Sequence, residues 1–169
     1  GSQRHRIAPG CRPRRIGSRN GNRIVSGAAE VSVAVRQALG ERAVELREEH
    51  GWAIATVEAG RWFECAAALR DALGLDYLAS LTAVDLKDNF ELVAHLYSIA
   101  GRGQLALKCR LGRDNAVVES LTKLWSAADW HEREAAEMFG IHFEGHQNLA
   151  GLLLPADWVG QPLRKDYDE

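Results

Sequence analysis

The chain has 169 residues, of which 46% are hydrophobic, and its 21 lysines and arginines oppose 23 acidic residues, a formal net charge of -2. This length favours a single domain, and the composition excludes both a disordered acidic chain and a uniformly basic nucleic-acid coat. All apolar runs are shorter than the roughly 18 residues that a membrane-spanning helix needs. Three widely spaced cysteines fit neither a disulfide framework nor a CxxC pair, so we expect a reducing compartment.

The charge is unevenly distributed along the chain. Residues 1–29 hold seven arginines and no acidic residue, whereas the remainder carries 14 basic and 23 acidic side chains, a net charge of -9. Three interpretations of residues 1–27 stay open: a flexible terminus without a function of its own, an organelle transit peptide, and an arm that binds RNA, anionic lipid or an acidic partner. The prolines, the glycines and the missing periodicity favour a disordered arm.

The first predicted elements are two helices with a hairpin between them. Apolar residues at helical spacing predict a short helix over residues 31–39, which Gly40 ends. Two β-rich runs predict strands over 43–47 and 52–57 joined by a turn. A second amphipathic pattern predicts a helix over 62–73.

The later elements follow the same rules. Alternating apolar and polar residues predict two half-buried antiparallel strands over 90–97 and 105–111. Apolar residues spaced from Val117 to Leu124 predict another helix, and a further helix is predicted over 130–139. After Gly140 the glycines and prolines leave no regular pattern.

These elements predict an α+β fold in which a mixed or antiparallel sheet is covered by helices, mainly on one face. We expect three parts: an Arg-rich arm over 1–27, an α+β domain over 28–140, and an extended irregular C-terminal arm over 141–169. Because the last part cannot build a core of its own, we expect it to lie on something else.

A glycine-rich stretch from Gly101 to Ala106 formally fits the dinucleotide pattern GxGxxG/A. That site needs a strand before the glycines and a helix after them, so that the helix N-terminus meets the pyrophosphate. Here a strand follows instead. The pattern therefore predicts a hairpin turn.

The histidines and acids around residue 131 are a weak candidate for metal or acid–base chemistry. His142 and His146 have the i, i+4 spacing of zinc ligands on a helix, but Gly145 and the local alternation argue against a helix there. A hydrolase using His131 with these two histidines stays a remote alternative. Nucleophilic catalysis has no candidate motif, so we expect no catalytic or metal-binding residue in this chain.

The helix predicted over 130–139 carries charges in unusual places. At 100° per residue, Glu132 and Glu134 both fall within a broad apolar arc, which is costly unless each carboxylate is paired. Arg133 and Glu137 are spaced to pair with each other. Two sources of donors stay open for the other carboxylates: the tail folding back, or a partner protein.

The same helix begins a longer motif with a known likeness. The motif runs through Glu132-Arg133-Glu134-x-x-Glu137-Met138-Phe139-Gly140-Ile141, Phe143-x-Gly145-His146, and Leu152-Leu153-Leu154-Pro155-x-Asp157-Trp158-x-Gly160-x-Pro162-Leu163-Arg164-Lys165-Asp166-Tyr167. It resembles the signature of the C subunit of NADH:quinone oxidoreductase, respiratory complex I. The Arg-rich arm lies outside the likeness.

This resemblance implies a non-catalytic subunit of the peripheral arm of a proton-translocating enzyme complex. It implies no cofactor in this chain, with NADH, FMN, iron–sulfur clusters and quinone in the assembled complex. The implied partners are the quinone-site (D) subunit and the cluster-bearing (B and I) subunits, with no nucleic acid. The implied location is the cytoplasmic side of the bacterial inner membrane, reached only through the complex, or alternatively an organelle matrix or stroma.

The resemblance also predicts which residues contact other subunits. They are Glu132, Arg133, Glu134, Phe139, Gly140, His146, Asp157, Trp158, Pro162, Leu163, Arg164, Lys165, Asp166 and Tyr167. We expect the segment from Leu152 to Tyr167 to take its order from a partner. Because the chain stops at Glu169, we expect no quinone-site subunit fused behind it.

One run departs from the family's pattern. Members generally carry Gly-His-Pro-Asp-Leu-Arg-Arg, whereas this chain has Gly145-His146-Gln147-Asn148-Leu149-Ala150-Gly151. An acid and two arginines are lost, which removes charge pairs that this loop would make. Two alternatives therefore stay open: the homologous subunit of a membrane-bound hydrogenase or formate hydrogenlyase, and, more remotely, a nucleic-acid-binding module driven by the Arg-rich arm.

Overall fold

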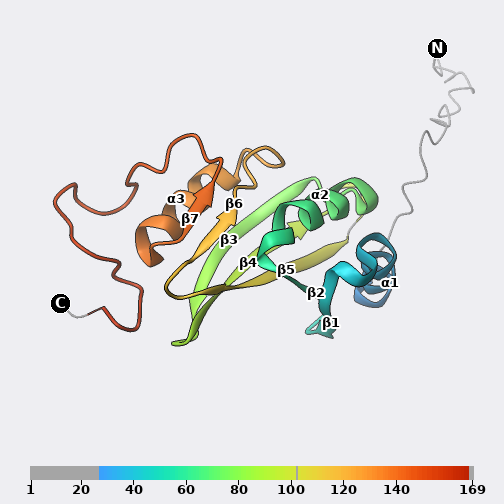
Figure 1. The fold of residues 1–169 in the computed structure, drawn as a ribbon. Coiled ribbons are helices and arrows are strands. Elements are labelled where there is room, and N and C mark those ends of the chain that lie inside the picture. Colours follow the sequence, from blue (N-terminus) through green and yellow to red (C-terminus); the bar gives the residue numbers. More distant parts are fainter. Residues whose placement is uncertain (1–26, 102, 168–169) are drawn as a thin grey trace, which may run out of the picture.

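The computed structural model describes residues 27–101 and 103–167 (Figure 1). The interpretations of the Arg-rich arm, and Cys11 within it, lie outside these residues. The elements in chain order are α1 (Ala28–Leu39), β1 (Ala43–Glu49), β2 (Trp52–Val57), α2 (Trp62–Leu73), β3 (Tyr77–Asp85), β4 (Asn89–Tyr97), β5 (Gln104–Gly112), β6 (Val117–Glu119), α3 (Ala128–Phe139) and β7 (His142–Glu144). Short 3-10 turns at Gly40–Arg42 and Ala59–Arg61 precede β1 and α2.

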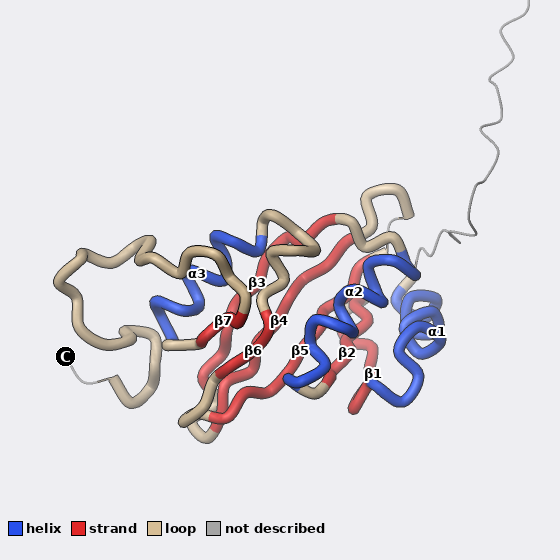
Figure 2. The backbone as a smooth tube through the Cα atoms, turned by 45° about the horizontal axis from the view of Figure 1, so that its top comes forward, coloured by secondary structure: helices blue, strands red, loops and turns tan. Residues whose placement is uncertain are grey.

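Five strands form one twisted mixed sheet in the order β1-β2-β5-β4-β3 (Figure 2). Neighbouring strands are antiparallel except for β2 and β5, which run parallel with Ala55 opposite Leu107. The connection between these two passes through α2 and the β3–β4 hairpin. A separate pair of short parallel strands, β6 and β7, lies beside α3.

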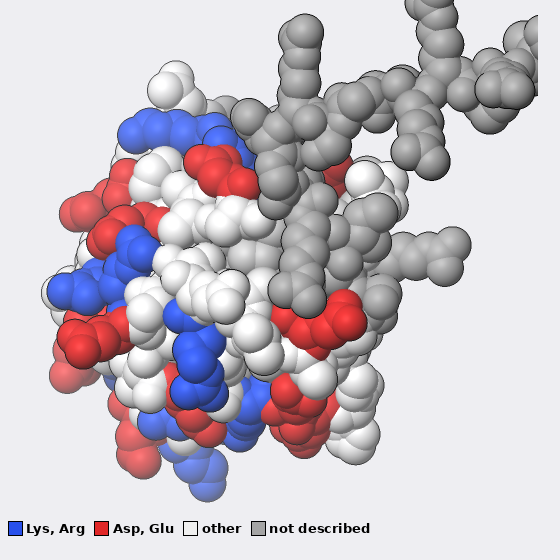
Figure 3. All heavy atoms as spheres, turned by 90° about the vertical axis from the view of Figure 1, so that its right-hand side faces the viewer, with Lys and Arg blue, Asp and Glu red and all other residues white. Residues whose placement is uncertain are grey.

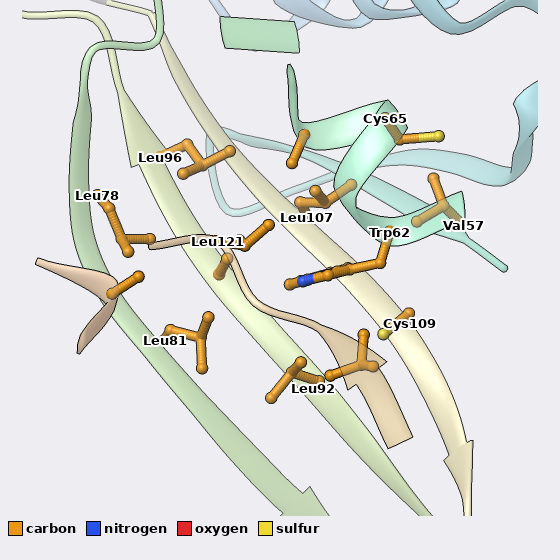
Figure 4. Packing of buried hydrophobic residues seen from close by; sticks show 14 of the residues in the cluster. Val57, Trp62, Cys65, Leu78, Leu81, Leu92, Leu96, Leu107, Cys109 and Leu121 are labelled. Carbon is orange, nitrogen blue, oxygen red and sulfur yellow. The ribbon is translucent and has the colours of Figure 1, made fainter. Parts of the chain in front are cut away.

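The core lies between one face of the sheet and the helices. Side chains that alternate along β4 and β5, such as Leu92 and Leu107, are fully buried beneath α2, whose Trp62 ring points toward them (Figure 4). Phe139 of α3 packs edge-on against Phe90 of β4, so α3 covers the same face. The opposite face carries a smaller cluster of Ile54, Val93 and Ala106 beside the half-buried Trp52. Helices therefore cover one face, and the predicted α+β class is confirmed.

Two predictions about individual elements are wrong. The helix expected from Val117 to Leu124 is instead the strand β6 followed by a turn, in which Leu124 N–H donates to Leu121 O. Three apolar residues at helical spacing were too few to outweigh pairing with β7. The strand β3 was missed because two features obscure its alternation. Its register shifts between Leu78 and Ser80, and at its end the apolar Val84 is exposed while the charged Asp85 is buried.

The glycine-rich stretch behaves as the hairpin prediction required. It joins β4 to β5, which are antiparallel neighbours, and Ser98 N–H donates to Gly103 O across the turn. The β1–β2 hairpin, the antiparallel β4–β5 pair and the helix over 62–73 are likewise confirmed. The helices predicted over 31–39 and 130–139 are also present, and each begins a little earlier than predicted.

Acidic and basic side chains intermix on the face of the molecule at the α1 end (Figure 3). Among the described residues, the charges of β1 illustrate this mixing, because Arg47 lies within 3.9 Å of the carboxylates of both Glu45 and Glu49. No helix within the described ranges is long and apolar enough to cross a bilayer.

Candidate functional site: helix α3 and the C-terminal segment

Glu132 is fully buried inside α3, where its carboxylate binds the turn after β6. The side chain accepts the Ser120 hydroxyl at 2.6 Å and the Leu121 backbone N–H at 2.6 Å. Burial raises the pKa of this carboxyl, opposed by the hydrogen bonds from Ser120 and Leu121. The donors that the sequence required for Glu132 thus come from this chain.

We call residues 145–167 the tail. His146 connects the start of the tail to the N-terminal half of α3. Its side chain is 1% exposed, and its Nδ1 accepts the backbone N–H of Asn148 at 3.0 Å. Because Nδ1 is an acceptor, the ring proton lies on Nε2, which faces the Asp129 carboxylate at 3.1 Å and the Glu132 carboxylate at 3.9 Å. His146 is therefore an anchor of the tail, and its ring is not free to bind a metal.

Arg133 and Glu137 hold the next part of the tail. They lie one and two turns after Asp129 on α3. Arg133 donates to the carbonyl oxygens of Ala150 and Gly151 at 3.0 and 3.1 Å. Glu137 accepts three successive backbone N–H groups, those of residues 152–154, at 2.8 to 3.1 Å. A Cβ at Gly151 would lie 2.9 Å from the Glu137 carboxylate, so a larger residue here would push this carboxylate away from the backbone N–H groups that it accepts.

The three backbone hydrogen bonds determine the direction of the pKa shift of Glu137. Burial would raise the pKa of the carboxyl, but the three backbone N–H groups, together with the charge of Arg133, outweigh it and lower the pKa below its ordinary value. The pair predicted between Arg133 and Glu137 is thus only a through-space attraction, since both side chains are turned toward the tail.

The far end of the tail is attached to the end of the sheet. Leu163 N–H donates to Met138 O at 3.2 Å, and Lys165 N–H donates to the Asp85 carboxylate at 2.8 Å. Arg113, just after β5, forms a bidentate pair with Asp85 at 2.8 and 3.0 Å and a second ion pair with Asp166 at 2.6 Å. Residues 80 positions apart in the sequence are joined here.

Between these attachments the chain projects into solvent. All residues from 155 to 160 are exposed, including Trp158 at 44% and Val159 at 83%. We call residues 155–160 the projecting span. The Trp158 ring stacks on Tyr167 with centroids 6.5 Å apart, and Gly160 has φ +92, where a Cβ would overlap the Tyr167 ring. Leu153 and Leu163, which flank the span in the sequence, are also exposed apolar residues.

The structure separates the predicted contact residues by their exposure. Glu132, Phe139 and the side chain of His146 are buried within the chain, while Arg133, Pro162, Arg164 and Tyr167 are half-buried. The exposed ones are Glu134, Gly140, Asp157, Trp158, Leu163, Lys165 and Asp166. Exposure alone does not decide the role, because the exposed Leu163, Lys165 and Asp166 also attach the tail through backbone hydrogen bonds and an ion pair. The exposed side chains of Glu134, Asp157 and Trp158 are the ones most available to a partner.

The placement of Glu134 in a buried apolar arc is wrong. Its neighbour one turn earlier, Trp130, is 60% exposed, and Glu134 is exposed with it. The buried face of α3 runs through Ala128, Glu132 and Ala135 instead. Taking Trp130 as the centre of the buried face shifted the predicted arc to the wrong side of the helix.

Sequence reasoning missed Asp85 and Arg113 as functional residues. Asp85 appeared only as part of the family likeness, and Arg113 follows a strand as one charged residue among several. A carboxylate at the buried-side position of a strand is a usable signal, because it requires a partner. Asp85 is 4% exposed and directly opposite Phe90 in the β3–β4 register.

Three other potentially reactive groups among the described residues are Cys65, Cys109 and the Ser80–His95 pair. Burial raises the pKa of Cys109 to about 12 and also raises that of Cys65, so both thiols stay protonated. Ser80 and His95 are hydrogen-bonded at 2.9 Å, but they are register partners of β3 and β4, as expected of a cross-strand pair. Within residues 27–101 and 103–167, no group of three or more potential ligands could hold a metal ion.

Comparisons with known proteins place this arrangement in a family. The family model described as the respiratory-chain NADH dehydrogenase 30 Kd subunit matches residues 55–169. The chain belongs to this family. It is 38% identical to the C subunit of NADH-quinone oxidoreductase from Citrifermentans bemidjiense, over 80% of this chain and 86% of that protein. It is 40% identical to the C subunit from Moorella thermoacetica, over 73% of this chain and 85% of that protein.

Two solved structures share the fold. The trypsin-resistant fragment (1-134) of Nqo5 has a TM-score of 0.62 at 24% identity, covering 70% of this chain and 98% of the fragment. A chain from the membrane-bound sulfane sulfur reductase, an archaeal respiratory membrane complex, has a TM-score of 0.64 at 24% identity, covering 79% of this chain and 83% of that chain. At this identity the likeness concerns the fold alone.

Proposed function

We propose that this chain is a non-catalytic subunit in the peripheral arm of a proton-translocating NADH:quinone oxidoreductase, and that its C-terminal segment docks it onto the quinone-site subunit. The curated relatives are named as subunits of an oxidoreductase, which supports the first part. The proposed neighbours also include the cluster-bearing (B and I) subunits. NADH, FMN, the iron–sulfur clusters and quinone would then be bound by other subunits, on the cytoplasmic side of a bacterial inner membrane.

The observation that carries the docking proposal is the projecting span. Residues 155–160 expose Trp158 and Val159 although both ends of the segment are hydrogen-bonded to the body of the chain. Keeping apolar side chains in water costs free energy, and burying them against a second protein recovers it. Fixed ends also reduce the ordering entropy that binding would otherwise cost.

The alternative complexes differ in their partners. A homologous subunit of a membrane-bound hydrogenase or formate hydrogenlyase would use the same span against a different neighbour. The fold likeness to a chain of a sulfane sulfur reductase is compatible with such a relative, but the NADH-quinone oxidoreductase relatives, at 38% and 40% identity, favour complex I.

Docking is tested by placing a charge on the projecting span in the native host. We expect Val159→Asp to lower the yield of the assembled complex on native gels by about tenfold or more, because an interface residue would bury an unpaired charge. Val44→Asp is the matched control, since Val44 is also an exposed valine, on the edge strand β1. Mass spectrometry of the complex band should identify a quinone-site subunit and a flavoprotein.

The outcomes separate the two parts of the proposal. If both variants assemble as well as the wild type, the projecting span is not the docking element. If the band contains a nickel-site subunit instead of the flavoprotein, the chain belongs to a hydrogenase. Both substitutions lie in exposed positions and should leave the melting temperature of the free chain nearly unchanged.

A further inference from the structure

The Asp85 carboxylate collects four donors at the end of β3. Its two oxygens accept the Arg113 guanidinium at 2.8 and 3.0 Å, the Lys87 backbone N–H at 2.7 Å and the Lys165 backbone N–H at 2.8 Å. The side chain is 2% exposed. Three of these donors come from the sheet end, and the fourth is the tail itself.

Arg113 connects this buried carboxylate to a second one on the tail. Its Nε donates to Asp166 at 3.2 Å and a terminal nitrogen lies 2.6 Å from the other Asp166 oxygen. The Phe90 ring is contacted by the guanidiniums of Arg113 and Arg164, at distances of 5.1 and 5.2 Å to its centroid. A planar cation with several donors can serve both carboxylates and the ring at once, which a lysine cannot do.

The contacts that hold the end of the tail are mostly polar. The Leu163 side chain is 53% exposed, its backbone N–H donates to Met138 O, and Pro162 and Tyr167 are only half-buried. Without the guanidinium, Asp85 and Asp166 would face each other as like charges across the contact. We therefore expect the state of residues 161–167 to depend strongly on Arg113.

We propose that Arg113 is a positioning residue that acts as a latch, setting the fraction of molecules in which residues 161–167 are closed onto the sheet. The closed state fixes the second end of the projecting span. A partner that binds only the closed state has an apparent dissociation constant equal to the intrinsic one divided by the closed fraction, so an open latch weakens docking without altering any contact residue. This consequence rests on the proposed docking function, whereas the latch itself does not.

Trypsin cleavage of the free full-length chain measures the latch directly. Arg164 and Lys165 are the only lysine or arginine residues after Arg133, and both take part in the closed arrangement. Removing a charged hydrogen-bonding partner should raise the open population on the order of tenfold, and cleavage with it when opening is fast. Intact-mass detection follows the loss of residues 165–169 or 166–169, according to which of the two bonds is cut.

We expect Arg113→Ala to be cleaved after residues 164 and 165 about tenfold faster than the wild type, and Arg113→Lys to fall between them. Arg110→Ala is the matched control: Arg110 is an exposed arginine on β5, three residues before Arg113, and this variant should be cleaved at the wild-type rate. Asp166→Asn leaves the Asp85–Arg113 pair in place, so it tests the latch even if Arg113→Ala fails to fold. It should also be cleaved faster than the wild type.

Equal cleavage of wild type, Arg113→Ala and Asp166→Asn overturns the latch. Asp166→Asn carries the comparison with stability, because Arg113→Ala also leaves the buried Asp85 without its partner and should lower the melting temperature for that reason alone. A latch predicts that Asp166→Asn is cleaved faster at a nearly constant melting temperature, whereas a purely structural role of Asp166 would lower the melting temperature in step with the cleavage rate. If Val159→Asp assembles normally while these cleavage differences persist, the docking function fails and the latch stands.

Discussion

The sheet with its helices and the C-terminal segment obtain their order from different interactions. In the first region, side chains such as Trp62, Leu69 and Leu107 are fully buried in one continuous apolar core. In the second, residues 145–167 are attached mainly by hydrogen bonds and ion pairs from α3 and from the sheet end. Polar attachments to half-exposed groups are individually weak, so the tail should open locally at a lower free energy than the core.

This difference suits a docking element. Three residues of α3 spaced four apart, Asp129, Arg133 and Glu137, face the tail at His146, at residues 150–151 and at residues 152–154. The helix α3 therefore attaches most of the C-terminal segment. We expect the core to be stable without that segment. Substitutions can perturb the two regions separately.

The largest effect is expected where the two regions meet, at Glu132. Glu132→Ala would leave the Ser120 hydroxyl and the Leu121 N–H without their buried acceptor and create a cavity, at a cost of about 2–4 kcal/mol. Thermal unfolding measures this loss. Glu132→Gln keeps the volume and one acceptor oxygen, so it should cost less. A wild-type melting temperature for Glu132→Ala would mean that this buried contact does not support the fold.

An intermediate effect, confined to the tail, is expected at Glu137. Glu137→Gln replaces one acceptor oxygen by an amide that repels a backbone N–H, so the amides of residues 152–154 should exchange about tenfold faster with deuterium. The melting temperature should hardly change.

Glu134→Gln is the matched control for this change, on the same helix but exposed. It should leave both the tail amides and the melting temperature of the free chain unaltered while weakening assembly, as expected of a partner-facing carboxylate. If Glu137→Gln lowers the melting temperature as much as Glu132→Ala does, the tail belongs to the same cooperative unit as the core and the comparison fails.

The smallest effect is an opposite response of the two regions to acid. Hydrogen bonding from Arg113 lowers the pKa of Asp166 to about 2 and holds the pKa of Asp85 well below its usual range. A carboxyl whose pKa is lowered on folding stabilises the folded state above its ordinary pKa of about 4. This stabilisation is lost as the pH falls through the pKa of the folded state. The latch should therefore open as the pH falls from about 4 toward 2.

The stabilisation that Glu132 contributes depends on pH in the opposite direction. Burial raises its pKa, so its contribution is fully present below the ordinary carboxyl value and is lost as the pH rises through the raised value. The backbone amides of Lys165 and Leu121 report the two carboxylates separately by NMR. Protection of both amides lost together during acidification would contradict the separation. Solvent screening keeps the Asp166 effect small, since that side chain is 54% exposed.

The periodic elements were predictable because burial of one face imposes a spacing on the sequence. The helix over 62–73 and the alternation along β4 and β5 carry that spacing plainly. The irregularity near Ser80 and the exposed Val84 beside the buried Asp85 obscured β3, and the apolar spacing of the short strand β6 and its following turn resembled that of a helix. The signal for these elements lies in strand pairing, which a local pattern does not contain.

The site was predictable in part. The need for donors around Glu132 followed from helical geometry, although the donors lie in the segment mistaken for a helix. The motif after Trp130 identified the tail, but its order was expected from a partner, whereas Arg133 and Glu137 supply much of it within the chain. The hydrogen bond between Lys165 and Asp85 joins residues that only the fold brings together, so no local sequence pattern predicts it.

Hydrogen exchange of the free wild-type chain tests the two-region account most directly. We predict three classes of amide. The core strands exchange only through global unfolding, and the amides of residues 152–154 and Lys165 show weaker but measurable protection. The amides of the projecting span are unprotected apart from that of Trp158, which donates to Pro155 O within an exposed turn. Tail amides as slow as those of the sheet would mean a single cooperative unit. Tail amides at the unprotected rate would mean that α3 and Arg113 do not hold the segment, and either result contradicts the two-region account.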